Sequence, residues 1–127
     1  MNAIETVTVY RIEHEVEHVG PYCDWQFPGS EQLEAMYLAH TDAAHPGPRA
    51  EPALAALIDP SDFYFAFESI AQCQRWFGGW FGVLNNTGFI LRVYEVPVEH
   101  VILATKQCIF RMDEAELVEE RSLLTLN

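Results

Sequence analysis

The sequence has few basic residues. Lys and Arg together number 7, Lys106 is the only lysine, and 19 Asp and Glu give a formal net charge of -12. Proteins that bind nucleic-acid phosphates need clustered Lys and Arg, whereas the arginines here are scattered and mostly flanked by acids. The composition therefore argues against direct nucleic-acid binding. The excess of acid has two explanations: it keeps a small protein soluble, or it steers the protein to a partner with a basic surface.

Cysteines and long apolar runs are also scarce. The three cysteines, Cys23, Cys73 and Cys108, include no Cys-x-x-Cys pair, so their spacing predicts neither a disulfide framework nor a zinc site. The N-terminal residues lack the basic and apolar regions of a secretory signal, and no apolar run approaches the ~20 residues of a membrane-spanning helix. We therefore expect a cytoplasmic protein with reduced thiols and no membrane association.

Catalytic and metal-binding motifs are absent as well. His14 and His18 have a spacing that would place two imidazoles on one helical face, with His40 and His45 available, but no Cys or carboxylate stands at a diagnostic third position. No Gly-x-Ser-x-Gly nucleophile motif occurs. We predict no metal site, no cofactor and no confident catalytic residue.

What the sequence does contain is enough apolar material for one domain. The chain has 127 residues, of which 50% are hydrophobic and 13% aromatic, so intrinsic disorder is not expected. Apolar alternation and turn residues predict strands over 6–13, 63–67, 89–96 and 106–110, and helices over 30–41, 69–84 and 113–126. The predicted fold class is α+β: residues 1–127 form a single compact domain with a small, mostly antiparallel sheet of three to five strands and two or three helices.

Three features are candidates for a partner-binding surface. The proline-rich segment 42–60 is a long loop by pattern and carries His45, and long loops in compact domains are often functional. The aromatic helix 69–84 has more large rings than one core stripe needs, so Trp76 and Trp80 are candidates for an exposed interface, although packing under the loop is the alternative. The predicted C-terminal helix carries four candidate acids: Glu114, Glu116, Glu119 and Glu120.

The order of short motifs carries a resemblance to other proteins. The motifs are Tyr10-Arg11-Ile12-Glu13, Gly20-Pro21-Tyr22, His45-Pro46-Gly47-Pro48, Phe67-Glu68-Ser69, Trp76-Phe77, Gly88-Phe89, Tyr94-Glu95-Val96-Pro97 and Gln107-Cys108-Ile109-Phe110. In this order the chain resembles a group of small uncharacterised phage and bacterial accessory proteins. The resemblance implies a mobile-element protein that binds and inhibits a basic, nucleic-acid-handling host complex, in the manner of anti-defence or anti-CRISPR proteins. A structural subunit of a phage particle, self-associating through the aromatic helix, is an alternative.

A second resemblance is to the ADP-ribosyltransferase fold, and it rests on three positions. Arg11 on the first strand, Ser69 before a helix and Gln107 at a late strand correspond to the Arg, Ser and Glu of that family. The resemblance implies an NAD site at Tyr10, Arg11 and Ser69. Because Gln107 is neutral where the family has a glutamate, it cannot stabilise a developing oxocarbenium charge, and slow or absent transfer is expected.

Overall fold

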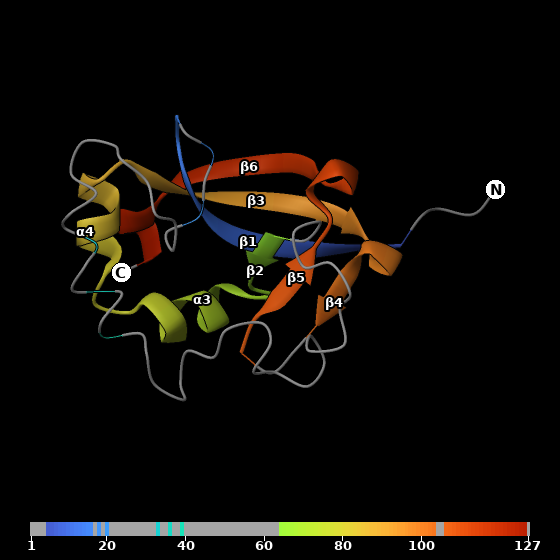
Figure 1. Cartoon of the computed structure of the whole chain (residues 1–127), viewed down its shortest axis with the longest axis horizontal. Helices are drawn as coiled ribbons and strands as arrows, with labels where there is room; N and C mark the ends of the chain where they lie inside the picture. Colours follow the sequence, from blue (N-terminus) through green and yellow to red (C-terminus); the bar gives the residue numbers. More distant parts are fainter. Residues whose placement is uncertain are drawn as a thin grey trace.

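The computed structural model describes residues 5–16, 18, 20, 33, 36, 39, 64–103 and 106–126. Figure 1 shows its strands gathered in two small sheets, with the helices to one side. The predicted loop 42–60 lies outside the described residues, and so does most of the predicted helix 30–41. Two apolar positions of that helix, Leu33 and Met36, are described, and both are buried in the core.

The first sheet, sheet A, has the order β1-β3-β6 and is antiparallel throughout. Its strands are β1 (Thr6–His14), β3 (Phe89–Pro97) and β6 (Glu116–Ser122). The predicted alternation of β1 is confirmed, because Val9 packs in one apolar cluster while Tyr10 and Ile12 pack in the other. The predicted strand 89–96 is confirmed as β3, which is the central strand.

The second sheet, sheet B, has the antiparallel order β2-β5-β4. Its strands are β2 (Tyr64–Ala66), β5 (Cys108–Phe110) and β4 (Val101–Leu103), and the turn η4 (Val98–His100) leads into β4. Tyr10 and Phe67 join the two sheets by exchanging both backbone hydrogen bonds, at 2.8 and 2.9 Å. The outer edge of β1 therefore meets the segment that follows β2.

The predicted helix 69–84 is divided into α3 (Ile70–Phe77) and α4 (Phe81–Asn86). The hydroxyl of Ser69 caps α3 by accepting a 3.1 Å hydrogen bond from the Gln72 N–H. The helix ends at the glycine pair, where Gly79 has a φ of +87° that other residues rarely adopt. Gly88, with a φ of +97°, ends the turn after α4 and leads into β3.

Two apolar clusters occupy opposite faces of sheet A. On one face, α3, α4 and the C-terminal turn η6 (Leu123–Leu126) cover residues such as Ile12 and Leu91. On the other face, sheet B packs against Val9, Tyr94 and Val96. In the view of Figure 1 the helices lie toward the left and sheet B toward the right, below the strands of sheet A. The α+β fold class is confirmed, with three strands in each sheet.

The predicted acidic helix over 113–126 is wrong. The segment instead forms a short turn, η5 (Met112–Glu114), then strand β6, then η6. Glu, Leu and Arg favour helices intrinsically, but propensity is a weak preference. Pairing with β3 supplies partners for the backbone of both strands. The adjacent Leu117 and Val118 also fail to form a helical apolar stripe, and both are exposed.

Candidate protein-binding edge

The three residues of the ADP-ribosyltransferase resemblance are all used within the fold. Arg11 Nη1 donates a 2.8 Å hydrogen bond to the Phe65 carbonyl, and its guanidinium lies 4.9 Å from the Tyr64 ring centroid. Ser69 caps α3, and Gln107 is buried immediately before β5. Tyr10, the fourth predicted NAD residue, packs its ring against the main core. These contacts explain the four residues structurally and give no support to an NAD cleft.

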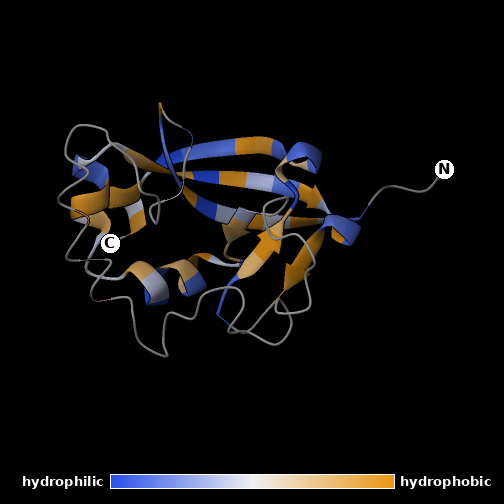
Figure 2. Cartoon of the chain, in the orientation of Figure 1, coloured by the Kyte–Doolittle hydropathy of each residue, from blue (hydrophilic) through white to orange (hydrophobic). Residues whose placement is uncertain are grey.

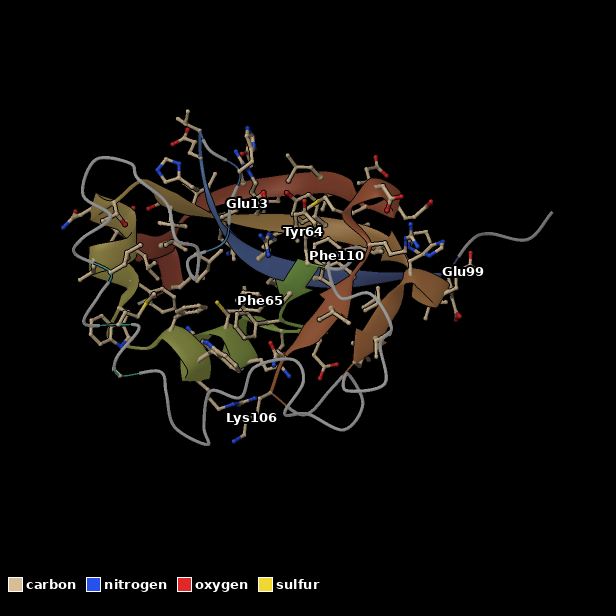
Figure 3. All side chains as sticks on the ribbon, viewed as in Figure 1. Glu13, Tyr64, Phe65, Glu99, Lys106 and Phe110 are labelled. Carbon is tan, nitrogen blue, oxygen red and sulfur yellow. The ribbon has the colours of Figure 1, made fainter. Side chains whose placement is uncertain are left out.

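Arg11 belongs to a buried ion cluster that the sequence analysis missed, formed with Glu13, Arg92 and Tyr94. Glu13 is only 2% exposed, and its carboxylate lies 3.5 Å from Arg11 Nε and 3.2 Å from Arg92 Nη1. The Tyr94 hydroxyl donates to the same carboxylate, at 2.8 and 3.0 Å from its two oxygens. Figure 3 shows Glu13 and Tyr64 near the centre of the view, whereas Glu99 and Lys106 lie at its periphery.

Burial and neighbouring charges shift the pKa values of three groups in this buried ion cluster. Burial lowers the pKa of Arg11 from its ordinary value, and the neighbouring Glu13 carboxylate opposes that shift. Desolvation also acts on Arg92, but hydrogen bonds and charge from Glu120 and Glu13 outweigh it and raise the pKa of Arg92. Burial and the Glu13 carboxylate raise the pKa of the Tyr94 phenol. The cluster therefore consists of charged arginines and a neutral phenol around one carboxylate, an arrangement typical of a structural network.

One sequence feature could have revealed the cluster. Arg92 and Glu95 interrupt the otherwise apolar strand Phe89–Pro97, and Arg11 and Glu13 share one face of β1. A charge within a buried strand needs a partner, because an unpaired charge in the interior is strongly unfavourable. Register places Arg92 directly opposite Arg11, and Glu13 compensates both.

Of the two tryptophans predicted as interface candidates, one is buried and one is half-buried. Trp76 is 6% exposed, and its ring contacts Phe65, Phe67 and Phe77. Trp80 is half-buried and packs against the same core. The prediction that Trp76 is part of an exposed surface is therefore wrong, because α3 turns this ring toward Phe65 and Phe67, in and just after β2. His45 lies outside the described residues.

The buried cysteines are not nucleophiles at neutral pH. Burial raises the pKa of the Cys73 thiol to about 12. The pKa of Cys108 is likewise raised to about 12, first by burial and then by the charge of Glu68. Since the thiolate is the reactive form, both side chains are inert core residues, as the apolar pattern around them predicted.

The four predicted acids come together on and just before β6, in a region that we call the acidic edge. Between Asp113 and Ser122 the chain carries five carboxylates and one arginine, and every residue of β6 except Arg121 is exposed. Figure 2 shows this strand as hydrophilic except for one short apolar patch. The patch is Leu117, 46% exposed, and Val118, 49% exposed. Two neighbouring apolar side chains are thus exposed among the acids of this edge.

The acidic edge holds more negative charge than its own cations offset. Glu119 is paired with Arg121 at 3.3 Å, and Glu120 with Arg92 at 2.9 Å. Glu116 has no ion pair with another described residue and stands directly opposite Glu95 in the β3–β6 register. Like charges at opposed positions of a sheet are destabilising. The Glu95 carboxylate, however, accepts hydrogen bonds from the Thr6 and Thr8 hydroxyls on the β1 side, so Glu116 is the carboxylate with which an external cation would pair.

The histidines and helices of the described part of the chain bear on metal binding and membrane spanning. Among those residues no three His, Cys, Asp or Glu side chains group so that they could hold a metal ion. His14 and His18 are within that part, whereas His40 and His45 are not. The described helices include none that is both long and apolar enough to cross a membrane.

Comparison with known proteins identifies the family. The family model described as Bacteriophage T4 Y00F protein matches residues 1–124, which is nearly the whole chain. No curated protein and no solved structure matches the chain. The match confirms the resemblance to phage proteins and gives no support to the resemblance to ADP-ribosyltransferases. The chain belongs to the bacteriophage T4 Y00F family.

Proposed function

We propose that this protein is a non-enzymatic phage accessory protein that holds a protein partner with a basic surface through its acidic edge. The observation that carries the proposal is the excess of exposed carboxylates on and before β6, of which Glu116 has no cation among the described residues. Complementary charge speeds the encounter of two proteins and disfavours wrong partners. The exposed Leu117 and Val118 supply apolar contact area beside those charges.

The chemistry of the acidic edge favours a target that normally binds nucleic acid. Such proteins present clustered Lys and Arg for phosphates, and a row of carboxylates competes for the same cations. Membership of a phage family makes a host complex the natural target. The proposed action is therefore inhibition of a nucleic-acid-handling host complex, including a defence complex, by occupation of its basic surface.

Two alternatives are less well supported by the contacts. Self-association through the aromatic helix needs exposed rings, but Trp76 and Phe77 lie in the core. Use of NAD needs an available Arg11, but its guanidinium is bound by the Phe65 carbonyl and Glu13. A thermal-shift titration tests NAD directly, because a ligand at a hundredfold excess over its Kd stabilises the folded state by about 2.7 kcal/mol. We expect no shift at millimolar NAD, and a clear rise in Tm would revive the NAD hypothesis.

The proposal is tested by comparing two variants that lose the same number of carboxylates at different places on the surface. One variant combines Glu114→Gln, Glu116→Gln and Glu119→Gln on the acidic edge. The matched control combines Glu15→Gln, Glu68→Gln and Glu99→Gln, which removes the same charge from three other exposed positions. Host proteins retained by the immobilised wild-type protein are identified, and their release by salt and by competing DNA is measured.

We expect the control variant to retain the captured partner and the acidic-edge variant to lose it. DNA should release the partner from the immobilised protein, because DNA and the acidic edge would bind the same basic surface of the partner. Equal loss in the two variants would show that total charge, rather than the acidic edge, attracts the partner. Full retention by both variants would contradict the proposal.

A further inference from the structure

We propose that the partner binds by adding a strand to β6, as an extended segment that carries Lys or Arg. This inference depends on the proposed function and specifies how the acidic edge holds its partner. Strand addition takes its affinity from main-chain hydrogen bonds and its specificity from the side chains that alternate along the strand. The structural basis is the direction of the β6 backbone groups, the exposure of its side chains and its charge.

The direction of the backbone groups of β6 follows from the two backbone hydrogen bonds between Tyr10 and Phe67. Tyr10 gives both its N–H and its C=O to Phe67, so these groups point away from β3. The pair of Tyr10 and Val93 is therefore not hydrogen-bonded, and Val93 directs its backbone groups toward β6. Neighbouring pairs in an antiparallel ladder alternate between bonded and non-bonded, so the next residue, Arg92, directs its backbone groups toward β1. Val93 is paired with Glu119, whose N–H and C=O therefore face β3.

The same alternation makes the backbone of Glu120 face outward. Glu120 is paired with Arg92, whose backbone groups are used on the β1 side. The β3–β6 register shifts between Val93 and Tyr94. Beyond this shift Leu117 is paired with Tyr94, whose backbone groups are directed toward β1, so the Leu117 backbone also faces outward. In the described part of the chain β6 is paired with β3 alone, and Figure 1 shows it along the upper border of sheet A. These outward groups form a template for a further strand.

Charge selects the occupant of this edge. A second copy of the chain, pairing β6 with β6, would bring glutamates close to glutamates, and like charges at opposed positions destabilise a sheet. A segment with Lys or Arg at alternate positions would instead face Glu116 and Glu119. Its intervening aliphatic residues would pack beside the exposed Leu117 or Val118. The occupant is therefore a basic, extended segment of a different protein.

A synthetic peptide provides the direct test on the wild-type protein. The probe alternates Lys and Val over ~8 residues, within the ordinary length of a strand, and it is titrated at low ionic strength. Amide hydrogen exchange followed by NMR separates the two directions of β6 backbone groups. We expect the Glu120 amide to become protected when the peptide binds, while the Glu119 amide, already bonded to β3, changes little.

Two matched comparisons separate strand addition from attraction between charges alone. A peptide that is N-methylated along one edge keeps its side chains but loses main-chain donors, and we expect it to bind about tenfold more weakly, the loss of one to two hydrogen bonds. Glu120→Pro removes the outward N–H, whereas Glu120→Ala removes only the side chain. Proline is tolerated on an edge strand when its missing N–H would face solvent. The proline variant should bind at least tenfold more weakly than the alanine variant.

The outcomes distinguish this proposal from the one on which it rests. Equal binding of the two peptides and of the two variants, together with an unprotected Glu120 amide, would overturn strand addition and leave an acidic docking surface. If the basic peptide does not bind and the acidic-edge variant also keeps its host partner, the proposed function fails too. Dimerisation through β6, seen as protection of Glu120 that rises with protein concentration, would identify a second copy as the occupant and overturn the assignment.

Discussion

Sheet A carries charge in two places, and the two differ in how that charge is balanced. In the buried ion cluster, one carboxylate, Glu13, lies between Arg11 and Arg92 and also accepts the Tyr94 hydroxyl. On the acidic edge, carboxylates outnumber cations and stand in solvent. The interior cannot hold an unbalanced charge, whereas the surface can. Balanced charge in this sheet therefore supports the fold, and unbalanced charge is the basis of the binding surface that we propose.

Glu120 connects the two regions. Its carboxylate accepts a 2.9 Å hydrogen bond from Arg92 Nε, while its own backbone faces the outer side of β6. Arg92 also donates to the carbonyls of His14 and Glu15, which fixes the end of β1. A partner strand on β6 would therefore meet an edge whose position is held from inside the fold. This is an advantage, because a pre-organised edge loses less conformational entropy on binding.

The largest expected effect comes from breaking the balanced region. Glu13→Gln keeps the shape of the side chain but leaves Arg11 and Arg92 without their shared counter-charge. Removing one partner of a buried ion pair costs about 3–5 kcal/mol, so we expect the free energy of unfolding in urea to fall by about 3 kcal/mol or more. As a control, Glu99→Gln at an exposed position should change it by less than about 0.5 kcal/mol. Equal effects of the two substitutions would contradict a structural role for the buried ion cluster.

An intermediate effect is expected from Tyr94→Phe, and it should depend on pH. At neutral pH the lost hydroxyl costs about 1–2 kcal/mol, because the Glu13 carboxylate loses a buried donor. The pKa of Tyr94 is raised in the folded state above its ordinary value of 10.0. The folded protein therefore holds this proton more tightly than the unfolded chain, and the stability that results is complete below about pH 10 and declines above it.

The pH dependence provides the measurement for Tyr94. Wild type and Tyr94→Phe are unfolded with urea between neutral pH and pH 11, and the difference between them is expected to shrink as pH rises past 10. Cys73 and Cys108, whose pKa values are raised from 9.0 to about 12, make both proteins less stable above about pH 9. They cancel in the difference. A difference that stays constant through this range would mean that Tyr94 does not hold its proton more tightly in the fold.

The smallest expected effect concerns the unbalanced region. Glu116 is opposite Glu95 in the ladder, but the Glu95 carboxylate is hydrogen-bonded to Thr6 and Thr8 on the β1 side. We therefore expect Glu116→Gln to raise the free energy of unfolding slightly, by at most about 0.5 kcal/mol. The gain should disappear at high salt, which screens exposed charges. The same substitution should weaken binding of a basic partner. A loss of stability would show that the two carboxylates do not repel one another.

The sequence by itself determined the strands with a clear apolar pattern. Alternating residues in β1 and the largely apolar composition of β3 depend on burial of side chains that are close in sequence, and both strands lie where the pattern predicted. The cap at Ser69 and the interruption at Gly78 and Gly79 are local as well. Membership of a phage family was likewise readable from the order of short motifs.

Only the tertiary structure decided β6 and the buried ion cluster. Glu116–Ser122 has residues that favour a helix locally, and it becomes a strand because β3 supplies its hydrogen-bond partners from a distant part of the sequence. Arg92 lies 79 residues from Glu13, and their ion pair depends on the register between β1 and β3. Local pattern contains no information about such register, because pairing between distant strands is determined by the packing of the whole domain.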